Sequence, residues 1–254
     1  MPRSTLALLT VLFALGVAGP AAAEDTVPVD KAAIEAIVRD YILAHPEVIE
    51  QALDAAEAKR VEAEQETQRR ALIDLHDALA HDPDTPVAGN ADGDVTVVAF
   101  TDYRCGFCRR AAPVVEALVA ADAGVRVAFK EFPILGPDSV DAARISLAAH
   151  RQDPSRYGAL HHAIFTSEDA IDEANVLAIA GSLGYDTASL KAAMLDPAID
   201  ALLTRNGELA QRLGIRGTPT FIIGATLIPG YSSLTDMQAA VADERACLAS
   251  ADPG

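Results

Sequence analysis

Residues 95 to 108 read VTVVAFTDYRCGFC, an apolar run followed at once by two cysteines with the spacing C-x-x-C. The β-branched run VTVVAF is typical of a buried strand. Beyond the cysteines, residues 111 to 120 (AAPVVEALVA) space their apolar side chains as a helix does. Cys105 is therefore predicted to lie where a strand ends and a helix begins.

This position favours a reactive thiolate at Cys105. The first N–H groups of a helix have no partners within the helix, and its positive end stabilises an anion. The thiolate, not the thiol, is the nucleophile in disulfide exchange. Cys108 comes one turn later and is expected to be more shielded, which suits it to attack a mixed disulfide and release the client. Arg104 and Arg109, and the next residue Arg110, add to the effect if they turn toward the sulfur, and otherwise form a solvated face.

Other interpretations of the two cysteines are weaker. A closed tetrahedral zinc site needs four ligands, and the sequence has no second cysteine pair. A disulfide across so short a loop would stabilise the fold little. Soft thiolates at Cys105 and Cys108 suit Cu(I), which we keep as an accessory hypothesis from the class of binding proteins. We expect no other metal, and no cofactor besides the redox-active disulfide Cys105–Cys108.

The N-terminus predicts export. Arg3 precedes an apolar run from Leu6 to Val17, and Ala21–Ala23 lead into acidic residues. This pattern is typical of a secretory signal peptide over residues 1–23, cleaved after Ala23. A membrane anchor is the alternative, but the run is too short to cross a bilayer of roughly 30 Å. The predicted location is the periplasm.

The charge excludes several kinds of partner. The sequence holds 20 basic and 37 acidic residues, a net charge of −17, so nucleic acid and anionic lipid are poor partners. Three cysteines in 254 residues are too few for a disulfide-built scaffold. Half of the residues are apolar, which is enough for a core in one or two domains.

Residues 24–80 are predicted to be helical. Apolar residues follow helical spacing from Ile34 to Ile42, with Asp30 as N-cap. A second stripe begins after Pro46, fades through the charged stretch 57–70 and resumes at Leu72. A helix with apolar ends and a charged middle needs a cover for those ends. We favour self-association over folding back onto the rest of the chain.

A first resemblance rests on the strand VTVVAF, the motif DYRCGFC, the helix after it, and GIRGTPTFIIG at residues 214–224. Together they resemble thioredoxin-fold disulfide oxidoreductases of the DsbA-like group. The resemblance implies an α/β fold over residues 81–254, with a helical domain inserted at about residues 138–213. It also implies that Thr218 and Pro219 form a cis peptide beside the cysteines; X-Pro is the linkage at which cis costs least.

A second resemblance lies upstream. The helix pair with YILAHPEVIEQAL at residues 41–53, the charged helix and the cysteine motif are similar to the suppressor-of-copper-sensitivity C (ScsC) proteins. Some members trimerise through this region and act as disulfide isomerases, and others lack the assembly. The resemblance implies a homo-oligomer, a trimer if the chain is ScsC-like. Active sites tethered in one assembly favour isomerisation, because they raise the effective concentration of dithiols around a single client.

The direction of the redox reaction stays open at this point. Strong oxidases of this group have Pro-His between the cysteines, whereas this chain has Gly106-Phe107, without an imidazole to support the thiolate. That dipeptide resembles isomerases and reductases, which favours a dithiol kept reduced by a membrane partner and acting on exported, cysteine-containing clients. The alternative is an oxidase with a quinone-linked oxidant, in which arginines replace the histidine.

Several other residues are candidates for the site. In related folds an acidic or basic residue shuttles protons under the dithiol, but Ala99 on the strand before the motif supplies no acid. Lys130 or Glu131 is the candidate for this role here, with solvated strand-end charges as the alternative. Cys247 is predicted to be a buried small hydrophobe, and His161-His162 a surface pair. The candidates for contact with a client peptide are Tyr103, Gly106, Phe107, Thr218 and Tyr231. For Tyr103, and for Asp102 before it, the alternative is that the side chain simply packs.

Overall fold

The structure is a computed structural model and describes residues 30–251. Contacts divide the described residues into two compact units, residues 30–58 and 59–251. The boundary falls inside helix α2 (Glu47–Asp74). The predicted signal peptide and its cleavage site after Ala23 lie outside the described residues. No helix within residues 30–251 is both long enough and apolar enough to span a bilayer.

The first unit contains α1 (Lys31–Ala44) and the beginning of α2. The Asp30 carboxylate accepts a hydrogen bond from the Ala32 N–H at 3.1 Å, which confirms it as N-cap. No residue of α1 is buried, although the helix is amphipathic. Helical spacing places four exposed apolar side chains along one face, Ile34, Ile37, Val38 and Tyr41, whereas the exposed Leu43 lies on the opposite face. This apolar stripe therefore has no cover within its own unit.

The second unit is built on one five-stranded sheet in the order β1-β3-β2-β4-β5. Strands β2 and β3 are parallel, and the other neighbouring pairs are antiparallel. The strands are β1 (Val87–Gly89), β2 (Val95–Thr101), β3 (Val125–Glu131), β4 (Thr220–Ile223) and β5 (Thr226–Pro229). Strand β1 is only three residues long and lies in a stretch rich in Pro, Gly, Asp and Asn, residues 81–94, whose composition is typical of a loop.

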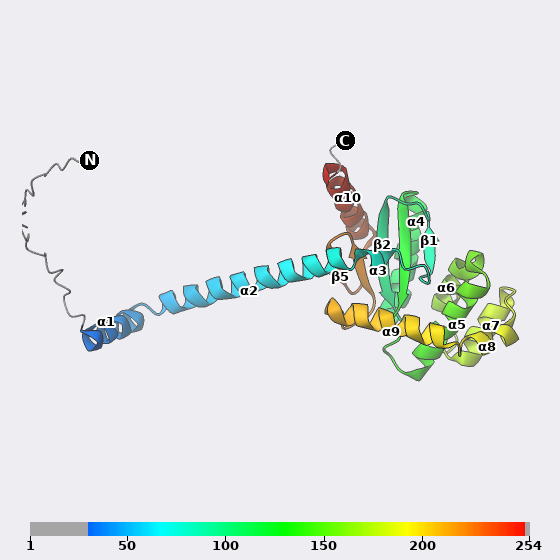
Figure 1. The fold of residues 1–254 in the computed structure, drawn as a ribbon, viewed down its shortest axis with the longest axis horizontal. Helices are drawn as coiled ribbons and strands as arrows, with labels where there is room; N and C mark the ends of the chain where they lie inside the picture. Colours follow the sequence, from blue (N-terminus) through cyan, green and yellow to red (C-terminus); the bar gives the residue numbers. More distant parts are fainter. Residues whose placement is uncertain (1–29, 252–254) are drawn as a thin grey trace, which may run out of the picture. The chain divides into compact units, whose positions relative to one another are not determined.

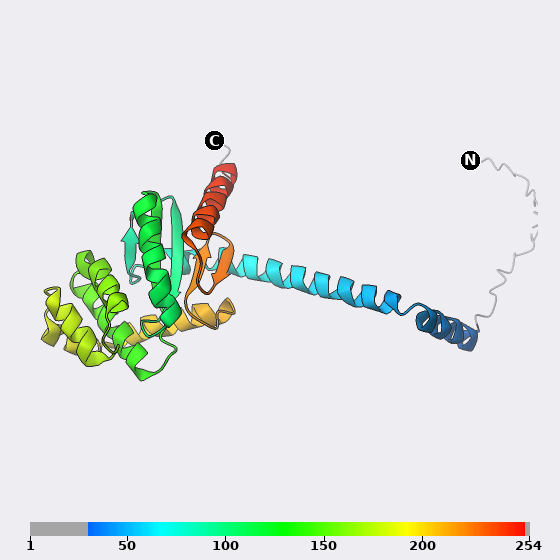
Figure 2. The same ribbon diagram turned by 180° about the vertical axis from the view of Figure 1, so that it is seen from behind.

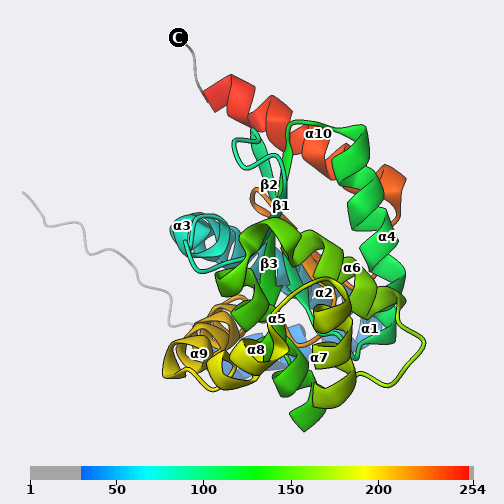
Figure 3. The same ribbon diagram turned by 90° about the vertical axis from the view of Figure 1, so that its right-hand side faces the viewer.

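Helices cover both faces of the sheet (Figures 1 and 2). Because side chains alternate along a strand, odd-numbered residues of β2 and β3 face α4 (Gly106–Ala121) and α10 (Leu234–Ala251). Even-numbered residues face α3 (His76–Ala80) and α9 (Pro197–Arg212). Figure 3 shows these two layers on opposite sides of the strands.

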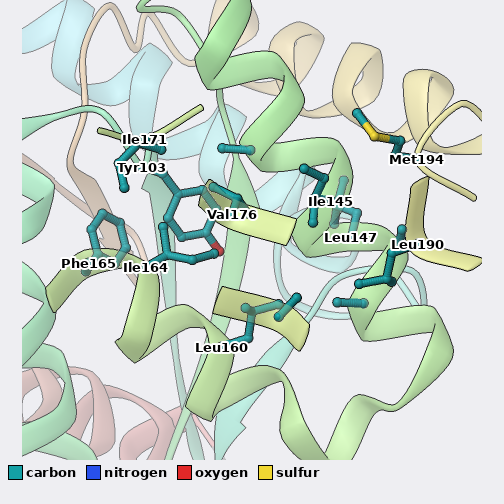
Figure 4. Packing of buried hydrophobic residues seen from close by; sticks show 14 of the residues in the cluster. Tyr103, Ile145, Leu147, Leu160, Ile164, Phe165, Ile171, Val176, Leu190 and Met194 are labelled. Atoms are coloured by element: carbon teal, nitrogen blue, oxygen red, sulfur yellow. The ribbon is translucent and has the colours of Figure 1, made fainter. Parts of the chain in front are cut away.

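The insertion predicted at about residues 138–213 is helical. It comprises α5 (Pro137–Gln152), the short 3₁₀ turn Pro154–Arg156, α6 (Tyr157–Thr166), α7 (Glu173–Ser182), α8 (Thr187–Ala193) and α9. Aspartates 172, 186 and 196 cap α7, α8 and α9 by accepting N–H groups of the first turns. The helices enclose their own core, in which Tyr103 packs beside Ile164 and Phe165 (Figure 4).

The end of α2 and α3 belong to the core of the second unit. Leu72, Leu75 and Leu79 are buried against the even-numbered face of the sheet. Deleting everything before residue 81 would therefore expose this core, so a truncation at that point tests stability rather than function.

Candidate active site

The two cysteines occupy the first turn of α4. Cys105 is the N-cap residue, with extended backbone, and its carbonyl accepts the Arg109 N–H at 3.0 Å. Cys105 is 8 % exposed and Cys108 is 2 % exposed, and both are free thiols. Burial raises the pKa of the Cys108 thiol well above its ordinary value. The outer sulfur thus lies at the positive end of a helix, and the inner one is protected from solvent.

Thr218 and Pro219 face the outer cysteine. Their peptide bond is cis, the geometry that the resemblance implies. The Cys105 thiol donates to the Thr218 carbonyl at 3.1 Å. The Pro219 carbonyl accepts the Gly230 N–H at 2.8 Å, which anchors this loop to the end of β5. Residues 113 positions apart in sequence therefore meet at the sulfur.

Asp102 organises the turn before the cysteines. Its side chain is buried and accepts four hydrogen bonds. Oδ1 accepts the Arg104 N–H at 2.8 Å and the Ser139 hydroxyl at 2.8 Å. Oδ2 accepts the Ile134 N–H at 2.9 Å and the Leu135 N–H at 3.0 Å. One carboxylate thus joins the cysteine turn to the loop that leads into α5. This role of Asp102 was not predicted from the sequence.

The arginines beside the motif are engaged away from the sulfur. Arg104 pairs with Asp138 at 3.1 Å, and Arg109 donates to the Ser167 carbonyl at 2.7 Å. The Arg110 guanidinium lies over the Phe107 ring, 4.5 Å from its centroid. The suggestion that Arg104 and Arg109 tune the Cys105 thiolate by direct contact is therefore wrong for this conformation.

Exposed apolar side chains surround the dithiol. Phe107 is 56 % exposed and Tyr231 is 46 % exposed, and Arg110 lies between their rings. Ile134 and Leu135, on the loop held by Asp102, are also exposed. These two residues were not predicted from the sequence. No neighbouring residue indicates that a carboxylate distant in sequence holds their loop beside the active site.

Two residues predicted for client contact have different outcomes. Tyr103 is buried, so its assignment as a contact for a client peptide is wrong. Gly106 is the first residue of α4, and an added Cβ there would meet open space. Contact of a client with Gly106, Phe107, Thr218 and Tyr231 stays a prediction.

Lys130 and Glu131 point to opposite faces of the sheet, and both are buried. The Lys130 ammonium donates to the Ala78 carbonyl at 2.8 Å and the Thr85 hydroxyl at 2.7 Å. It fixes α3 on the face away from α4, so a role for Lys130 beneath the dithiol is wrong. The alternative of solvated strand-end charges is wrong as well, because both side chains are inside.

Glu131 belongs to a buried polar cluster with Tyr103, Ser146, Tyr157 and His161. Its Oε1 accepts hydrogen bonds from the Tyr157 hydroxyl at 3.2 Å and the Ser146 hydroxyl at 3.4 Å. Burial raises the pKa of Glu131 to about 8. Burial also lowers the pKa of His161 to about 3, so this imidazole is neutral. The prediction of a surface pair was therefore wrong for His161, whereas His162 is exposed and bonds Glu116 at 2.8 Å.

Replacement of Glu131 by Gln is expected to change how stability depends on pH. The folded state binds a proton that the unfolded state releases between pH 4.5 and about 8, so the wild-type free energy of unfolding falls as pH rises across this window. His161 has the opposite effect, because its pKa is lower in the folded state than in the unfolded state. It makes the free energy of unfolding rise with pH, but only between pH 3 and 6.5. From pH 6.5 to 8 the free energy of unfolding of the wild type should fall by about 2 kcal/mol.

Urea unfolding at half-unit steps of pH measures this dependence. We expect Glu131→Gln to flatten the slope between pH 6.5 and 8. The matched control Glu116→Gln changes an acid that is not buried, and should leave the slope as in the wild type. Equal slopes in wild type and Glu131→Gln would contradict a raised pKa at this position.

Cys247 is exposed, so its prediction as a buried hydrophobe is wrong. The buried stripe of α10 ends with Met237 and Val241, and the helix continues for further turns without a buried residue. For metals, His76, Asp77 and His81 place ligand atoms within 4.8 Å of one another. All three are exposed and lie at the two ends of α3, and no buried ligand accompanies them, so this group carries no proposal of a metal site.

Two family models match this chain. The model described as "DSBA-like thioredoxin domain" matches residues 96–242, more than half of the chain. The model described as "Copper resistance protein ScsC N-terminal domain" matches residues 30–63.

Individual proteins resemble the chain over different spans. A thioredoxin-like oxidoreductase from Silicibacter pomeroyi DSS-3 is 44 % identical and has a TM-score of 0.64; the match covers 66 % of this chain and 96 % of that one. A linker-deletion mutant of Proteus mirabilis ScsC is 30 % identical with a TM-score of 0.67, covering 90 % and 99 %. The Na(+)/H(+) antiporter NhaA 3 from Salinispora tropica is 27 % identical over 93 % of this chain, but the chain spans only 35 % of its length.

Proposed function

The chain belongs to the family of DSBA-like thioredoxin domains, with an ScsC-like N-terminal region, and from this premise we propose that it is a thiol–disulfide oxidoreductase acting on exported proteins. The observation that carries the proposal is the position of Cys105. Its sulfur lies at the N-terminus of α4 and opposite the Thr218 carbonyl, at 3.1 Å, with Cys108 buried one turn behind it.

The geometry supports exchange in two steps. The Cys105 thiolate attacks a client disulfide, forms a mixed disulfide and releases one client thiolate, which takes a proton from solvent. The Cys108 thiolate then attacks the Cys105 sulfur, releases the second client sulfur and forms the Cys105–Cys108 disulfide. The client has gained two electrons and the dithiol has lost two. A client thiol that attacks the mixed disulfide first gives isomerisation instead.

We favour isomerase or reductase activity over oxidase activity. Gly106-Phe107 offers no imidazole to stabilise the reduced thiolate, and the nearby arginines bond other groups. A less stabilised thiolate makes the dithiol less oxidising. This direction requires a membrane partner that returns the disulfide to the dithiol. The periplasmic location, the exported clients and this reductant are parts of the proposal.

Oligomerisation is a further part of the proposed function. The apolar stripe of α1 is exposed in its own unit, and burying it in copies of the same helix would remove Ile34, Ile37 and Tyr41 from water. A trimer would follow the ScsC resemblance. Several dithiols held on one assembly act on the same client at raised effective concentration, which favours isomerisation.

The test uses the full chain, because the core of the second unit includes Leu72 and Leu79. We expect Ile37→Glu combined with Tyr41→Glu to lower the assembly mass in light scattering and to reduce refolding of scrambled ribonuclease about tenfold. Exchange with a small disulfide should stay unchanged. Ala36→Glu, on the opposite side of α1, is the matched control.

Other outcomes decide between the remaining functions. Rapid oxidation of reduced ribonuclease by the wild type, without isomerisation, would favour the oxidase. Cu(I) retained at Cys105 and Cys108 in a protein that exchanges no thiols would favour the copper-binding function. Unchanged isomerisation by a monomeric variant would exclude the assembly as its cause.

A further inference from the structure

The resolving step requires Cys108 to lose a proton inside the protein. Its thiol is 2 % exposed, and burial raises its pKa well above the ordinary value. Bulk water is thus a poor acceptor for this proton, and a neighbouring group has to take it. The inference below rests on the proposed function, because it concerns the second step of that exchange.

The strand beneath the dithiol holds no acid that could do so. Ala99 is fully buried on the face of β2 that packs against α4, and it presents only a methyl group there. Lys130 lies on the other face of the sheet, and the Asp102 oxygens already accept four hydrogen bonds. Glu116 on α4 also lies near Cys108, but it is exposed and pairs with His162 at 2.8 Å. The buried candidates for the acceptor therefore lie on the inserted helices and at the end of β3.

A small cavity touches the Cys108 side chain. Its volume is about 30 Å³, which is room for one water molecule, and its polar lining beside Cys108 consists of Thr101, Glu116 and His161. The Thr101 hydroxyl oxygen is buried and has no hydrogen-bond partner in the described part of the chain. A buried hydroxyl without a partner next to a space of this size is what an internal water would satisfy.

His161 connects this cavity to the buried polar cluster. Its Nδ1 lies 3.0 Å from the Tyr103 hydroxyl, which leaves Nε2 as the nitrogen available to the cavity. The Tyr103 hydroxyl lies 2.7 Å from the Ser146 hydroxyl, and Ser146 donates to Glu131 Oε1 at 3.4 Å. Polar atoms thus form a continuous chain from the cavity beside Cys108 to the Glu131 carboxylate.

We propose that this chain is a proton relay, in which His161 takes the Cys108 proton by way of the cavity water and Glu131 receives a proton at the far end. His161 holds its proton on Nδ1 and donates to the Tyr103 oxygen; Tyr103 donates to Ser146, and Ser146 donates to Glu131. When Cys108 releases its proton, each donor passes one proton along. The Glu131 carboxylate becomes a carboxylic acid, Cys108 becomes a thiolate, and His161 stays neutral throughout.

The pKa of the acceptor, Glu131, suits this proton transfer. A base works best when its pKa is near the working pH, and that of Glu131 is raised to about 8 by burial. Other groups that face the relay are the Tyr157 hydroxyl, which also bonds Glu131, and the His150 ring beside Tyr157. Glu116 and His162 form an ion pair at the rim of a second, larger space that His161 also lines.

The test separates the two exchange steps with 5,5′-dithiobis(2-nitrobenzoate). Attack by Cys105 releases the first nitrothiobenzoate, and resolution by Cys108 releases the second, so stopped-flow absorbance follows both. All variants carry Cys247→Ser, because this exposed thiol would otherwise react. The wild-type rate of the second release should rise with pH, with a midpoint near 8.

Glu131→Gln should slow the second release about 10²-fold and remove the midpoint near pH 8, while the first release stays at the wild-type rate. His161→Gln should slow the second release similarly. His162→Gln, one residue away on the exposed side, is the matched control and should behave as the wild type. Thr101→Val, which removes the hydroxyl that would hold the water, should slow the second release, whereas Thr101→Ser should not.

The outcomes separate this inference from the proposed function. Wild-type rate and pH profile in Glu131→Gln would overturn the relay while leaving the oxidoreductase intact. The absence of any second release in the wild type would instead refute the dithiol exchange itself. Should His161→Gln fail to fold, as judged by circular dichroism, Glu131→Gln and the Thr101 pair decide the question.

Discussion

Cys105→Ser is expected to abolish thiol exchange, with a fall of about 10³-fold or more in the reduction of a small disulfide. A serine hydroxyl does not ionise near neutral pH, so the helix N-terminus has no anion to stabilise. Cys108 cannot replace the lost nucleophile, because its thiol is buried and burial raises its pKa. The measurement is the rate of nitrothiobenzoate release from 5,5′-dithiobis(2-nitrobenzoate), in proteins that also carry Cys247→Ser because that thiol is exposed.

Two further variants make this result specific. Cys108→Ser keeps the nucleophile but removes the resolving thiol, so it should accumulate client proteins as mixed disulfides at Cys105 that non-reducing gels display. Cys247→Ser, at the exposed third thiol, should retain full activity. Trapping of clients by Cys105→Ser, or equal activity of Cys105→Ser and the wild type, would contradict the assignment of the nucleophile.

The strand before the cysteines and the helix that begins at them could be predicted from the sequence. A β-branched run directly before C-x-x-C predicts a strand and then a helix, and the structure has β2 and α4 there with Cys105 as N-cap. Local chemistry also accounts for two helix starts in the insertion, since Pro137 and Pro197 are the first residues of α5 and α9. These features depend on neighbouring residues, which periodicity and turn chemistry describe directly.

Features that depend on distant contacts were not predicted. Nothing near Asp102 in sequence indicates that its oxygens bond N–H groups of residues 134 and 135. For His161 a signal existed, because Tyr157, His161, Ile164 and Phe165 lie at helical spacing and are all buried. This buried helical stripe was not predicted, because histidine was treated as a polar surface residue. Lys130 and Glu131 show the same limit, since sequence alone cannot say that a charged pair at a strand end is covered on both faces.

Asp102→Ala should have the largest effect on stability of any substitution near the cysteines. It removes one buried carboxylate and leaves four donors without an acceptor: the N–H groups of Arg104, Ile134 and Leu135 and the Ser139 hydroxyl. Unpaired buried donors cost about 1–3 kcal/mol each, partly recovered by relaxation and entering water, so we expect a loss of about 3–5 kcal/mol. Urea unfolding at pH 7 measures the loss.

Asp102→Asn tests whether the carboxylate itself is required, because it keeps the size of the side chain. Each Asp102 oxygen accepts two hydrogen bonds, so whichever way the amide turns, its NH₂ group faces donors. We expect a loss of about 2 kcal/mol or more, and about tenfold slower exchange, because the cysteine turn is no longer held to the loop before α5.

Asp138→Asn is the matched control for both substitutions. Asp138 pairs with Arg104 at the surface, where such an ion pair contributes at most about 1 kcal/mol. If Asp102→Asn is no more destabilising than Asp138→Asn, the four short contacts of Asp102 do not hold the turn. In that case the position of Cys105 would have to depend on the helix N-terminus and the Thr218–Pro219 loop alone.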